Sequence, residues 1–523
     1  MQKTRRAGLV LTLLFVASLP AITPRIYASD EIEYFSFLRS LWFDRDLSFD
    51  NEYRHFFDRG LARSQGFHET FLERTTPTGR RENFATIGCA LLWAPFYATA
   101  DLGVRARAAL GYAARADGYS PPYIAAACYA SALYGFLALL LSLHAFQVIA
   151  RADLARAAGP AATLAVWLGT PLLFYMYIAP PYSHAVSAFA VAAFVVAWLH
   201  VRRRWSPGGF ALLGALAALM AMVREQDIFI AGGPALDLAL TGVAAFRRSR
   251  AEKGGAPSRP GPGRLAIGAL VSGAAFVVCY LPQAAAYLVL NGRVGPSRLV
   301  ARKMTWTSPH ALQVLASPDH GFLFWTPLAL LSIAGLILLA LGRRRGTTPG
   351  TQPPVEDGRR VGACLLLMVA LQVYVAGSIE SWTVAGAFGQ RRFVGLTIAL
   401  VVGLGVLLSR ARSPWRRAAV TLALVLTVWW NVALLVQFGS GMMDRQRLEL
   451  APNAYNAFVV VPRDLPGVAY RYLFERDSFY RWGRPGGEEQ KKGSGARIQD
   501  SDRHEPSAET SRAVEIRPLA PGS

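Results

Sequence analysis

Carboxylates are concentrated in one short stretch of this sequence, DEIEYFSFLRSLWFDRDLSFDNEY, residues 30–53. The stretch holds seven Asp or Glu in 24 residues, whereas the 358 residues from 83 to 440 hold only eleven. A carboxylate that is partly removed from water has a raised proton affinity and can act as a general base near neutral pH. Asp30, Glu31 and Glu33, at the start of the stretch, are therefore candidate catalytic groups.

A purely structural role fits the same three residues. Asp30 can cap a helix with Glu33 at the third helical position, as in a capping box, and acidic residues in a first turn suit the helix dipole. Both interpretations stay open on the sequence. For the four later acids, a solvated loop with turn-forming residues is predicted; they are Asp44, Asp46, Asp50 and Glu52.

The chain that carries this stretch is strongly apolar, with 53% hydrophobic and 17% charged residues, against about 25% charged residues in average soluble domains. Its apolar residues form long blocks, many near the ~18 to 20 residues that span a bilayer as a helix. The sequence therefore predicts an all-α polytopic membrane protein. Beyond a first apolar segment at 1–23, the spans are expected near 121–149, 161–178, 181–200, 209–223, 227–245, 265–290, 322–342, 361–378, 393–409 and 418–438.

The net charge of +21 does not indicate a nucleic-acid-binding protein. The Lys and Arg residues sit in short clusters between apolar blocks, the orientation signal of membrane proteins, and no basic face with interleaved aromatic residues appears. Each of the four cysteines stands alone in an apolar block, so neither a zinc site nor a disulfide framework is predicted.

The sidedness of the chain depends on the block 84–100, FATIGCALLWAPFYATA. If this block does not cross the membrane, the later cytoplasmic loops hold 20 Lys or Arg and the opposite loops hold seven; if it crosses, the ratio inverts, against the positive-inside rule. We therefore expect 84–100 to lie at the outer interface or to dip in and out, consistent with Pro95 in its middle. The first segment is either a cleaved signal peptide or, as we favour, a retained helix. The result is about eleven crossings with the N-terminus inside.

This topology divides the chain into three parts. Residues 1–440 form the transmembrane domain, in which 25–120 is a long first outer loop. The apolar stripe of Tyr34, Phe37, Leu38, Leu41 and Trp42 predicts a helix lying on the bilayer surface within that loop. Residues 441–484 keep aromatic and apolar pairs and are expected to form a small extracytoplasmic cap, and 485–523 are expected to be disordered.

Few cations and histidines lie on the predicted outer side. Arg224 stands in the polar island MVREQD, and Arg391 and Arg392 follow a Gly-rich turn at the start of a span. Charges beside membrane spans are costly and often functional, although an Arg at a membrane edge can simply snorkel. For three further residues substrate contact competes with an interfacial contact or a helix cap; they are His184 in APPYSHA and Asp319 and His320 in SPDHG.

The acid pair at the start of the first outer loop, on an interfacial helix, resembles the GT-C membrane glycosyltransferases, which include protein O-mannosyltransferases and the bacterial lipid A aminoarabinose transferase. SPDHGFLFWTP (317–327) and SWTVAGAFGQRR (381–392) look like segments of bacterial mannosyltransferase-like members. The resemblance covers about residues 1–440. It implies transfer of a sugar from a polyprenyl-phosphate donor to an acceptor hydroxyl, of unknown identity, at the outer face of the bacterial cytoplasmic membrane.

The resemblance also implies roles for individual residues. Asp30 is expected to be the base, and Glu31 to orient the acceptor or bind a possible divalent metal; no other cofactor is implied. Cations for the donor phosphate are expected among Arg224, Arg391, Arg392 and Lys303. Two alternatives remain: a transporter or flippase of lipid-linked saccharides, which would favour inverted repeats and mid-membrane charges that we do not find, and a non-catalytic membrane protein.

Overall fold

The computed structural model describes residues 2–62, 65–150, 152–251, 261–342, 358–384 and 386–479. Regular structure in these residues is helical, apart from two isolated β-bridges, Thr75–Arg81 and Met304–Ile379. The predicted all-α class is thus confirmed.

Among the described residues, seven helices are long and apolar enough to cross a membrane. They are α6 (Pro121–Ile149), α9 (Ser183–Val201), η4 with α11 (Glu225–Ala231 and Gly232–Ala251), α12 (Pro262–Asn291), α17 (Gly358–Gly377), η5 with α18 (Arg391–Leu396 and Thr397–Arg410) and α19 (Pro414–Ser440). Shorter apolar helices are α1 with η1 (Gln2–Ser18 and Leu19–Ala21), α7 (Ala152–Leu168), α10 (Pro207–Val223) and α16 (Leu328–Leu341). These helices are those of a membrane protein.

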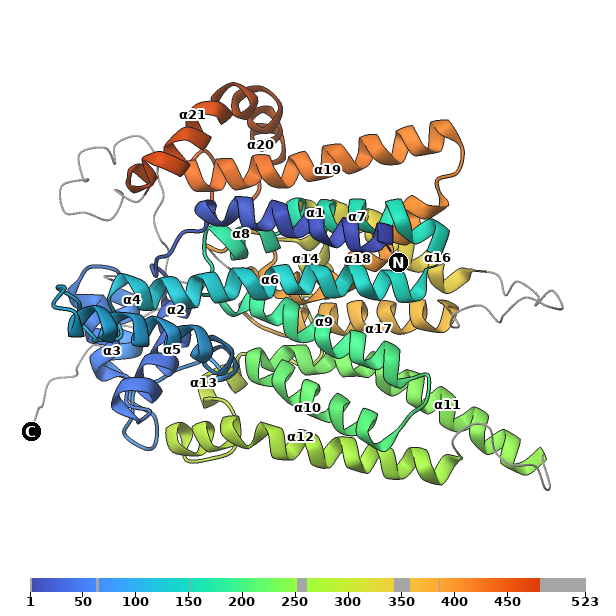
Figure 1. Ribbon diagram of the computed structural model, residues 1–523, viewed down its shortest axis with the longest axis horizontal. Coiled ribbons are helices and arrows are strands. Elements are labelled where there is room, and N and C mark those ends of the chain that lie inside the picture. Colours follow the sequence, from blue (N-terminus) through green and yellow to red (C-terminus); the bar gives the residue numbers. More distant parts are fainter. Residues whose placement is uncertain are drawn as a thin grey trace, which may run out of the picture.

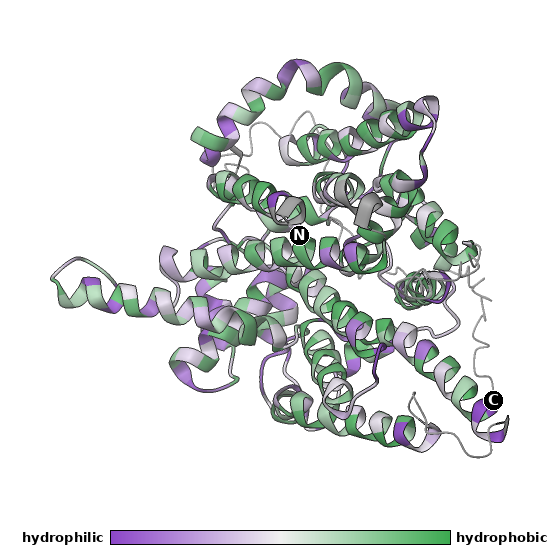
Figure 2. Cartoon of the chain, turned by 45° about the vertical axis from the view of Figure 1, so that its right-hand side comes forward, coloured by the Kyte–Doolittle hydropathy of each residue, from purple (hydrophilic) through white to green (hydrophobic). Residues whose placement is uncertain are grey.

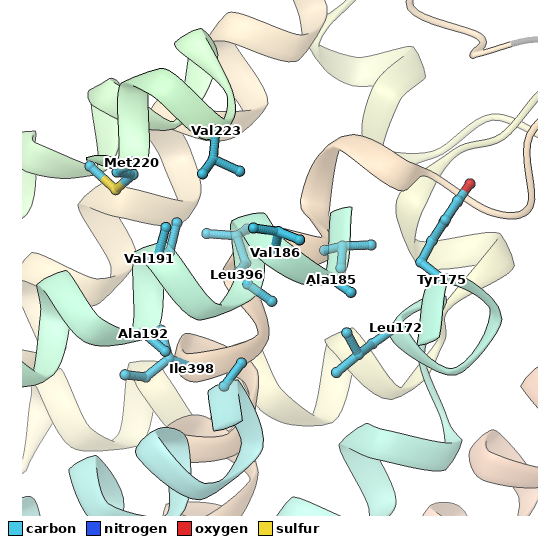
Figure 3. Close-up of a cluster of buried hydrophobic side chains, with 14 of the residues drawn as sticks. Leu172, Tyr175, Ala185, Val186, Val191, Ala192, Met220, Val223, Leu396 and Ile398 are labelled. Carbon is cyan, nitrogen blue, oxygen red and sulfur yellow. The ribbon is translucent and has the colours of Figure 1, made fainter. Parts of the chain in front are cut away.

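The long helices run side by side, and the short helices of the first predicted loop gather at one end of the bundle (Figure 1). We call this the site end. It holds α2 (Ser29–Arg39), α3 (Asp50–Asp58), α4 (Gln65–Phe67), which continues as η3 (His68–Glu73), and α5 (Gly88–Ala109). Hydrophobic residues dominate the long helices, whereas hydrophilic residues collect in the loops and near helix ends (Figure 2). The start of α9 packs its apolar side chains against α8, α10, η5 and α18 (Figure 3).

The block 84–100 lies in α5, which continues to Ala109 with Pro95 inside it. Within the described chain, α5 is not among the helices long and apolar enough to span a membrane. It lies beside α2 at the site end (Figure 1). Its interfacial position in a bilayer remains a prediction.

Two predicted spans are wrong in their bounds. The span 322–342 is divided at Thr326 and Pro327 into α15 (Phe322–Trp325) and α16. The segment 161–178 is not a continuous helix, because α7 ends at Leu168 and a separate short helix, α8 (Leu172–Tyr177), follows. Pro171 explains the break, since proline lacks the backbone N–H and disfavours helical geometry in the residue before it. The break directs α8 toward the site end, where its aromatic residues join the polar cluster described below.

Residues 441–479, the described part of the predicted cap, lie along the side of α19 (Figure 1). Their helices are α20 (Leu450–Tyr455), η6 (Asn456–Val460), α21 (Val461–Phe474) and η7 (Arg476–Phe479). The indole N–H of Trp429 donates to the carbonyl of Ala457 at 2.9 Å. Trp429 lies eleven residues before the end of α19, a distance of about 16 Å along the helix. The predicted disordered tail, 485–523, lies outside the described residues.

Between the long helices lie three shorter connections: α13 (Arg298–Arg302), α14 (Ala311–Leu315) and α15 (Phe322–Trp325). They join α12 to α16 and carry the SPDHG segment.

Candidate functional site

Helix α2 begins with a cap that the sequence did not assign correctly. The Glu31 carboxylate accepts hydrogen bonds from the backbone N–H groups of Tyr27, at 2.8 Å, and Ala28, at 3.0 Å. The capping carboxylate is therefore Glu31, and the predicted pairing of an Asp30 cap with Glu33 is wrong. Because the Glu31 side chain is completely buried, its carboxylate is directed at the backbone rather than at solvent.

Glu33 is also turned inward. One of its carboxyl oxygens accepts the backbone N–H of Phe84 at 2.6 Å. Burial raises the pKa of Glu31 to about 8, against the opposing hydrogen bonds of Tyr27 and Ala28, and burial together with the charge of Asp30 raises the pKa of Glu33. Both carboxyls are thus biased toward the neutral, protonated form near neutral pH.

Asp30 is the carboxylate of this turn that reaches the surface, with 37% of its side chain exposed. The Arg391 guanidinium donates to it at 2.6 Å, across 361 residues of sequence. The guanidinium carbon of Arg391 also lies 5.6 Å from the centre of the Tyr182 ring. The structure therefore brings together the predicted base and one of the predicted phosphate-binding cations.

Arg224 and Arg392 join this pair from two other segments. Arg224 contacts Nδ1 of His184 at 2.5 Å and donates to the Arg391 carbonyl at 3.5 Å. Arg392 donates to the carbonyls of Ser381, at 2.8 Å, and Trp382, at 3.3 Å. The three predicted arginines thus lie on adjoining segments.

Three helix starts converge on the arginines. α9 begins one residue before His184, η4 with α11 begins directly after Arg224, and η5 with α18 begins at Arg391. The N-terminus of a helix carries a partial positive charge and free N–H groups, and both favour an anion. Together with three guanidinium groups, these starts make the site end suited to a phosphate group.

His184 lies inside this cluster and not on its surface. Its ring packs edge-on against Tyr175 at 4.4 Å and stacks on Tyr182 at 5.6 Å between ring centres. Its Nε2 is buried without a described hydrogen-bond partner. The contact that the structure shows for His184 is with Arg224, and through it the ring can orient that guanidinium.

His320 joins the two motifs that carry the family resemblance. Its Nε2 lies 2.8 Å from the Ala387 carbonyl, its ring stacks on Trp325 at 4.6 Å, and its own carbonyl accepts from Gln390 at 3.2 Å. Burial lowers the pKa of His320 to about 4, so the ring is neutral at physiological pH. His320 thus fastens the loop that ends at Arg391 and does not itself reach Asp30 through any described contact.

Asp319 and Lys303 are not brought into the cluster by a described contact. Asp319 is half-exposed and lies 3.7 Å from the Arg447 guanidinium, and the residue that caps α15 is Gly321. Lys303 is exposed at the end of α13, where its carbonyl accepts the N–H of Glu380. The geometry gives neither residue a contact with the Asp30–Arg391 pair.

Two residues of the cluster were missed on the sequence. Tyr182 provides the ring beside Arg391, and the Gln226 amide donates to the Arg392 carbonyl at 3.2 Å. Both stand within segments already noted for a neighbour, APPYSHA and MVREQD. Their position in the sequence, next to polar residues at the start of an apolar span, could have identified them.

The prediction of a solvated loop is wrong for Glu52. Its side chain is completely buried and pairs with the Arg39 guanidinium at 2.9 Å, while Arg39 lies 4.5 Å from the centre of the Tyr119 ring. Burial raises the pKa of Glu52 to about 7. The prediction is also wrong for Asp50, which stays partly exposed but begins α3 and pairs with Arg54 and Arg81. The later part of the acidic stretch thus holds the site end together.

A divalent metal gains no support from the geometry. In the part of the chain that the structure describes, no three His, Cys, Asp or Glu side chains are grouped as a metal site requires. Glu31, the residue expected to bind it, is directed at two backbone N–H groups.

Comparisons of the chain with protein-family models, with curated proteins and with solved structures find no match. The function therefore has to be argued from this site.

Glu31 predicts a pH dependence of stability. Its pKa is about 8 in the folded chain, against an ordinary value of 4.5. The folded chain holds this proton more tightly than the unfolded chain. The stabilisation that results is fully present below about pH 4.5 and is lost as the pH rises toward 8. Glu31→Gln keeps an acceptor for Tyr27 and Ala28 but does not titrate. Relative to wild type, the variant should gain about 1.4 kcal/mol per pH unit across this window. Thermal unfolding of both proteins from pH 5 to 8 checks this, and parallel curves would contradict it.

Proposed function

We propose that this protein transfers a sugar from a polyprenyl-phosphate donor to an acceptor hydroxyl at the outer face of the bacterial cytoplasmic membrane. One observation carries the proposal: the Asp30 carboxylate lies 2.6 Å from Arg391, where Arg224, Arg392 and three helix starts also meet. A base beside a cluster of cations at the end of an apolar bundle suits a reaction in which a lipid phosphate leaves. The GT-C-like motifs support the same activity.

The reaction needs only groups that this site can supply. Asp30 takes the proton of the acceptor hydroxyl while the hydroxyl oxygen attacks the anomeric carbon of the sugar. The bond between that carbon and the phosphate oxygen breaks, and its electron pair stays on the phosphate. Arg391, Arg392 and Arg224 stabilise the negative charge that develops there. The products are the glycosylated acceptor, the polyprenyl phosphate and a proton, which Asp30 returns to water.

A cavity of about 390 Å³ supports a lipid-linked donor. It lies between α1, α7, α8 and α19, and apolar side chains form most of its lining, among them Leu14, Leu164, Leu168, Leu173 and Leu435. It also includes Ile178, whose carbonyl accepts from the Tyr27 hydroxyl at 3.3 Å. Since the N–H of Tyr27 binds Glu31, the cavity adjoins the start of α2. We propose that it takes part of the isoprenoid chain.

The proposal includes eleven crossings, with the N-terminus inside and the site end outside. The seven long and the four shorter apolar helices are the proposed crossings, and the loop charges set their direction.

Cysteine accessibility tests this orientation, in a chain whose four native cysteines are replaced. Arg74→Cys, at the site end, should react with a membrane-impermeant maleimide on intact cells. Arg204→Cys, at the turn between α9 and α10, should react only after permeabilisation. Both side chains are exposed, so burial does not limit either reaction. Labelling in the reverse order would overturn the orientation.

Asp30→Asn tests the proposed activity. In vesicles supplied with polyprenyl-phosphate sugars and envelope extract as acceptor, the variant should release polyprenyl phosphate at least ~100-fold more slowly than wild type, the usual scale for a lost general base. Asp46→Asn is the matched control, because it lies on the same segment and its amide can still accept from Ser40 and Ser48, as the carboxylate does. If Asp30→Asn releases polyprenyl phosphate at the wild-type rate, Asp30 is not the base. If the wild-type protein releases none, the proposed transferase activity is refuted.

A further inference from the structure

Arg391 is the point at which Asp30 meets the rest of the cluster. In the described part of the chain, the Asp30 side chain has one hydrogen-bond partner, the Arg391 guanidinium at 2.6 Å. Arg391 has 21% of its side chain exposed, so an incoming ligand can reach it. The Asp30 carboxylate, which would take the proton of the acceptor, is thus bonded to the Arg391 guanidinium, which would bind the donor phosphate.

The other two arginines have no described carboxylate bonded to them. Arg224 contacts the His184 ring and a backbone carbonyl, and Arg392 contacts backbone carbonyls and the Ser381 hydroxyl. Glu31 and Glu33, the nearest acids on α2, are buried and directed at backbone N–H groups. The only direct carboxylate contact of these three guanidinium groups, within the described residues, is that of Asp30 with Arg391.

We infer that Asp30 and the phosphate of the donor compete for Arg391, so that donor binding releases Asp30 to act as the base. The inference rests on the proposed function. A phosphate group binds guanidinium groups through paired, charge-assisted hydrogen bonds, and it repels a carboxylate placed beside it. When the phosphate takes Arg391, the Asp30 carboxylate is released from the guanidinium and is free to accept the proton of the acceptor hydroxyl.

This competition sets the order of the reaction. In the empty site the Asp30 carboxylate is bonded to Arg391, so it is not free to accept a proton from water or an acceptor before the donor has arrived. Donor binding precedes acceptor activation. When the isoprenyl phosphate has formed and Asp30 has lost its proton to water, the carboxylate regains Arg391 and favours release of the phosphate.

The test is direct binding of farnesyl phosphate, a short isoprenyl monophosphate, to the full-length protein in nanodiscs, measured by calorimetry. Asp30→Asn removes the competing charge and should tighten binding about tenfold, which is modest for relief of a like-charge contact. Arg391→Gln should weaken binding. In the double variant the gain from Asp30→Asn should vanish, because the residue for which the two anions compete is gone. Asp46→Asn should bind like wild type.

Two further ligands separate the sources of the effect. Inorganic phosphate should show the same tightening in Asp30→Asn with lower affinity overall, because it lacks the chain. Farnesol, which lacks the phosphate, should show none. Tightening that appears equally with farnesol would place the effect in the chain-binding cavity and overturn the inference.

The outcome is separable from that of the proposed function. Unchanged or weaker farnesyl phosphate binding by Asp30→Asn overturns the competition, even if wild type transfers sugar. Tighter binding that depends on Arg391 supports the competition, even if no transfer is found, in which case the transferase alone fails.

Discussion

Replacing Arg391 by glutamine is expected to slow sugar transfer by about 100- to 1,000-fold, the usual cost of removing one preorganised group that stabilises the charge of a transition state. Glutamine keeps a hydrogen-bond donor near Asp30 but removes the positive charge. Lysine at this position should give an intermediate rate, because an ammonium keeps the charge but not the planar pair of donors. The measurement is the rate of polyprenyl phosphate release at saturating donor.

The control for Arg391→Gln is Arg298→Gln. Arg298 lies at the start of α13 and is exposed, and an exposed Arg at a membrane edge can simply snorkel. Its substitution should leave the transfer rate within about twofold of wild type, as is usual for exposed side chains that bind nothing. Equal losses in the two variants would mean that Arg391 contributes only general surface charge.

Replacing Asp237 by alanine is expected to destabilise the folded chain by about 3–5 kcal/mol, the range for breaking a buried ion pair from one side. Asp237 is almost fully buried on α11. It accepts from the Trp198 indole at 3.0 Å and pairs with Arg202 at 2.8 Å and with Arg360 at 2.5 Å. The alanine variant leaves two guanidinium groups without their common carboxylate.

Thermal unfolding in detergent measures this effect, with Asp464→Ala as the control. Asp464 is exposed in the first turn of α21, so its loss should shift unfolding little. An Asp237→Ala protein that unfolds at the wild-type temperature would contradict a role for this residue in joining α9, α11 and α17.

The sequence allowed the helical class to be predicted because long apolar blocks have few alternatives. It also allowed Asp30, Arg224 and Arg391 to be chosen, because charges at the edges of such blocks are costly and rare. Their contact could not be predicted, since Asp30 and Arg391 lie 361 residues apart. Helix packing alone decides which segment ends meet.

Predictions for single side chains were wrong where more than one residue could fill the same structural role. The sequence offered Asp30 with Glu33 as the cap of α2, but the carboxylate that accepts the backbone N–H groups of Tyr27 and Ala28 is that of Glu31. Glu52 was indistinguishable from a solvated acid, because its partner Arg39 belongs to a different helix. The end of α7 at Leu168 could have been predicted, because Pro171 indicates a helix break. The apolar block was instead read as one span because of its length.

The last described helices hold the segment that leads into Asp30. The Tyr472 hydroxyl donates to the Ala21 carbonyl at 2.8 Å, and Arg476 donates to the carbonyls of Ile22, at 2.6 Å, and Pro20, at 2.7 Å. A ribosome makes Asp30 early and Arg476 more than four hundred residues later. The proposed base is therefore among the first residues to be synthesised, yet its surroundings are completed only when nearly the whole described chain has entered the membrane, so a chain interrupted during synthesis would carry the residue without the site.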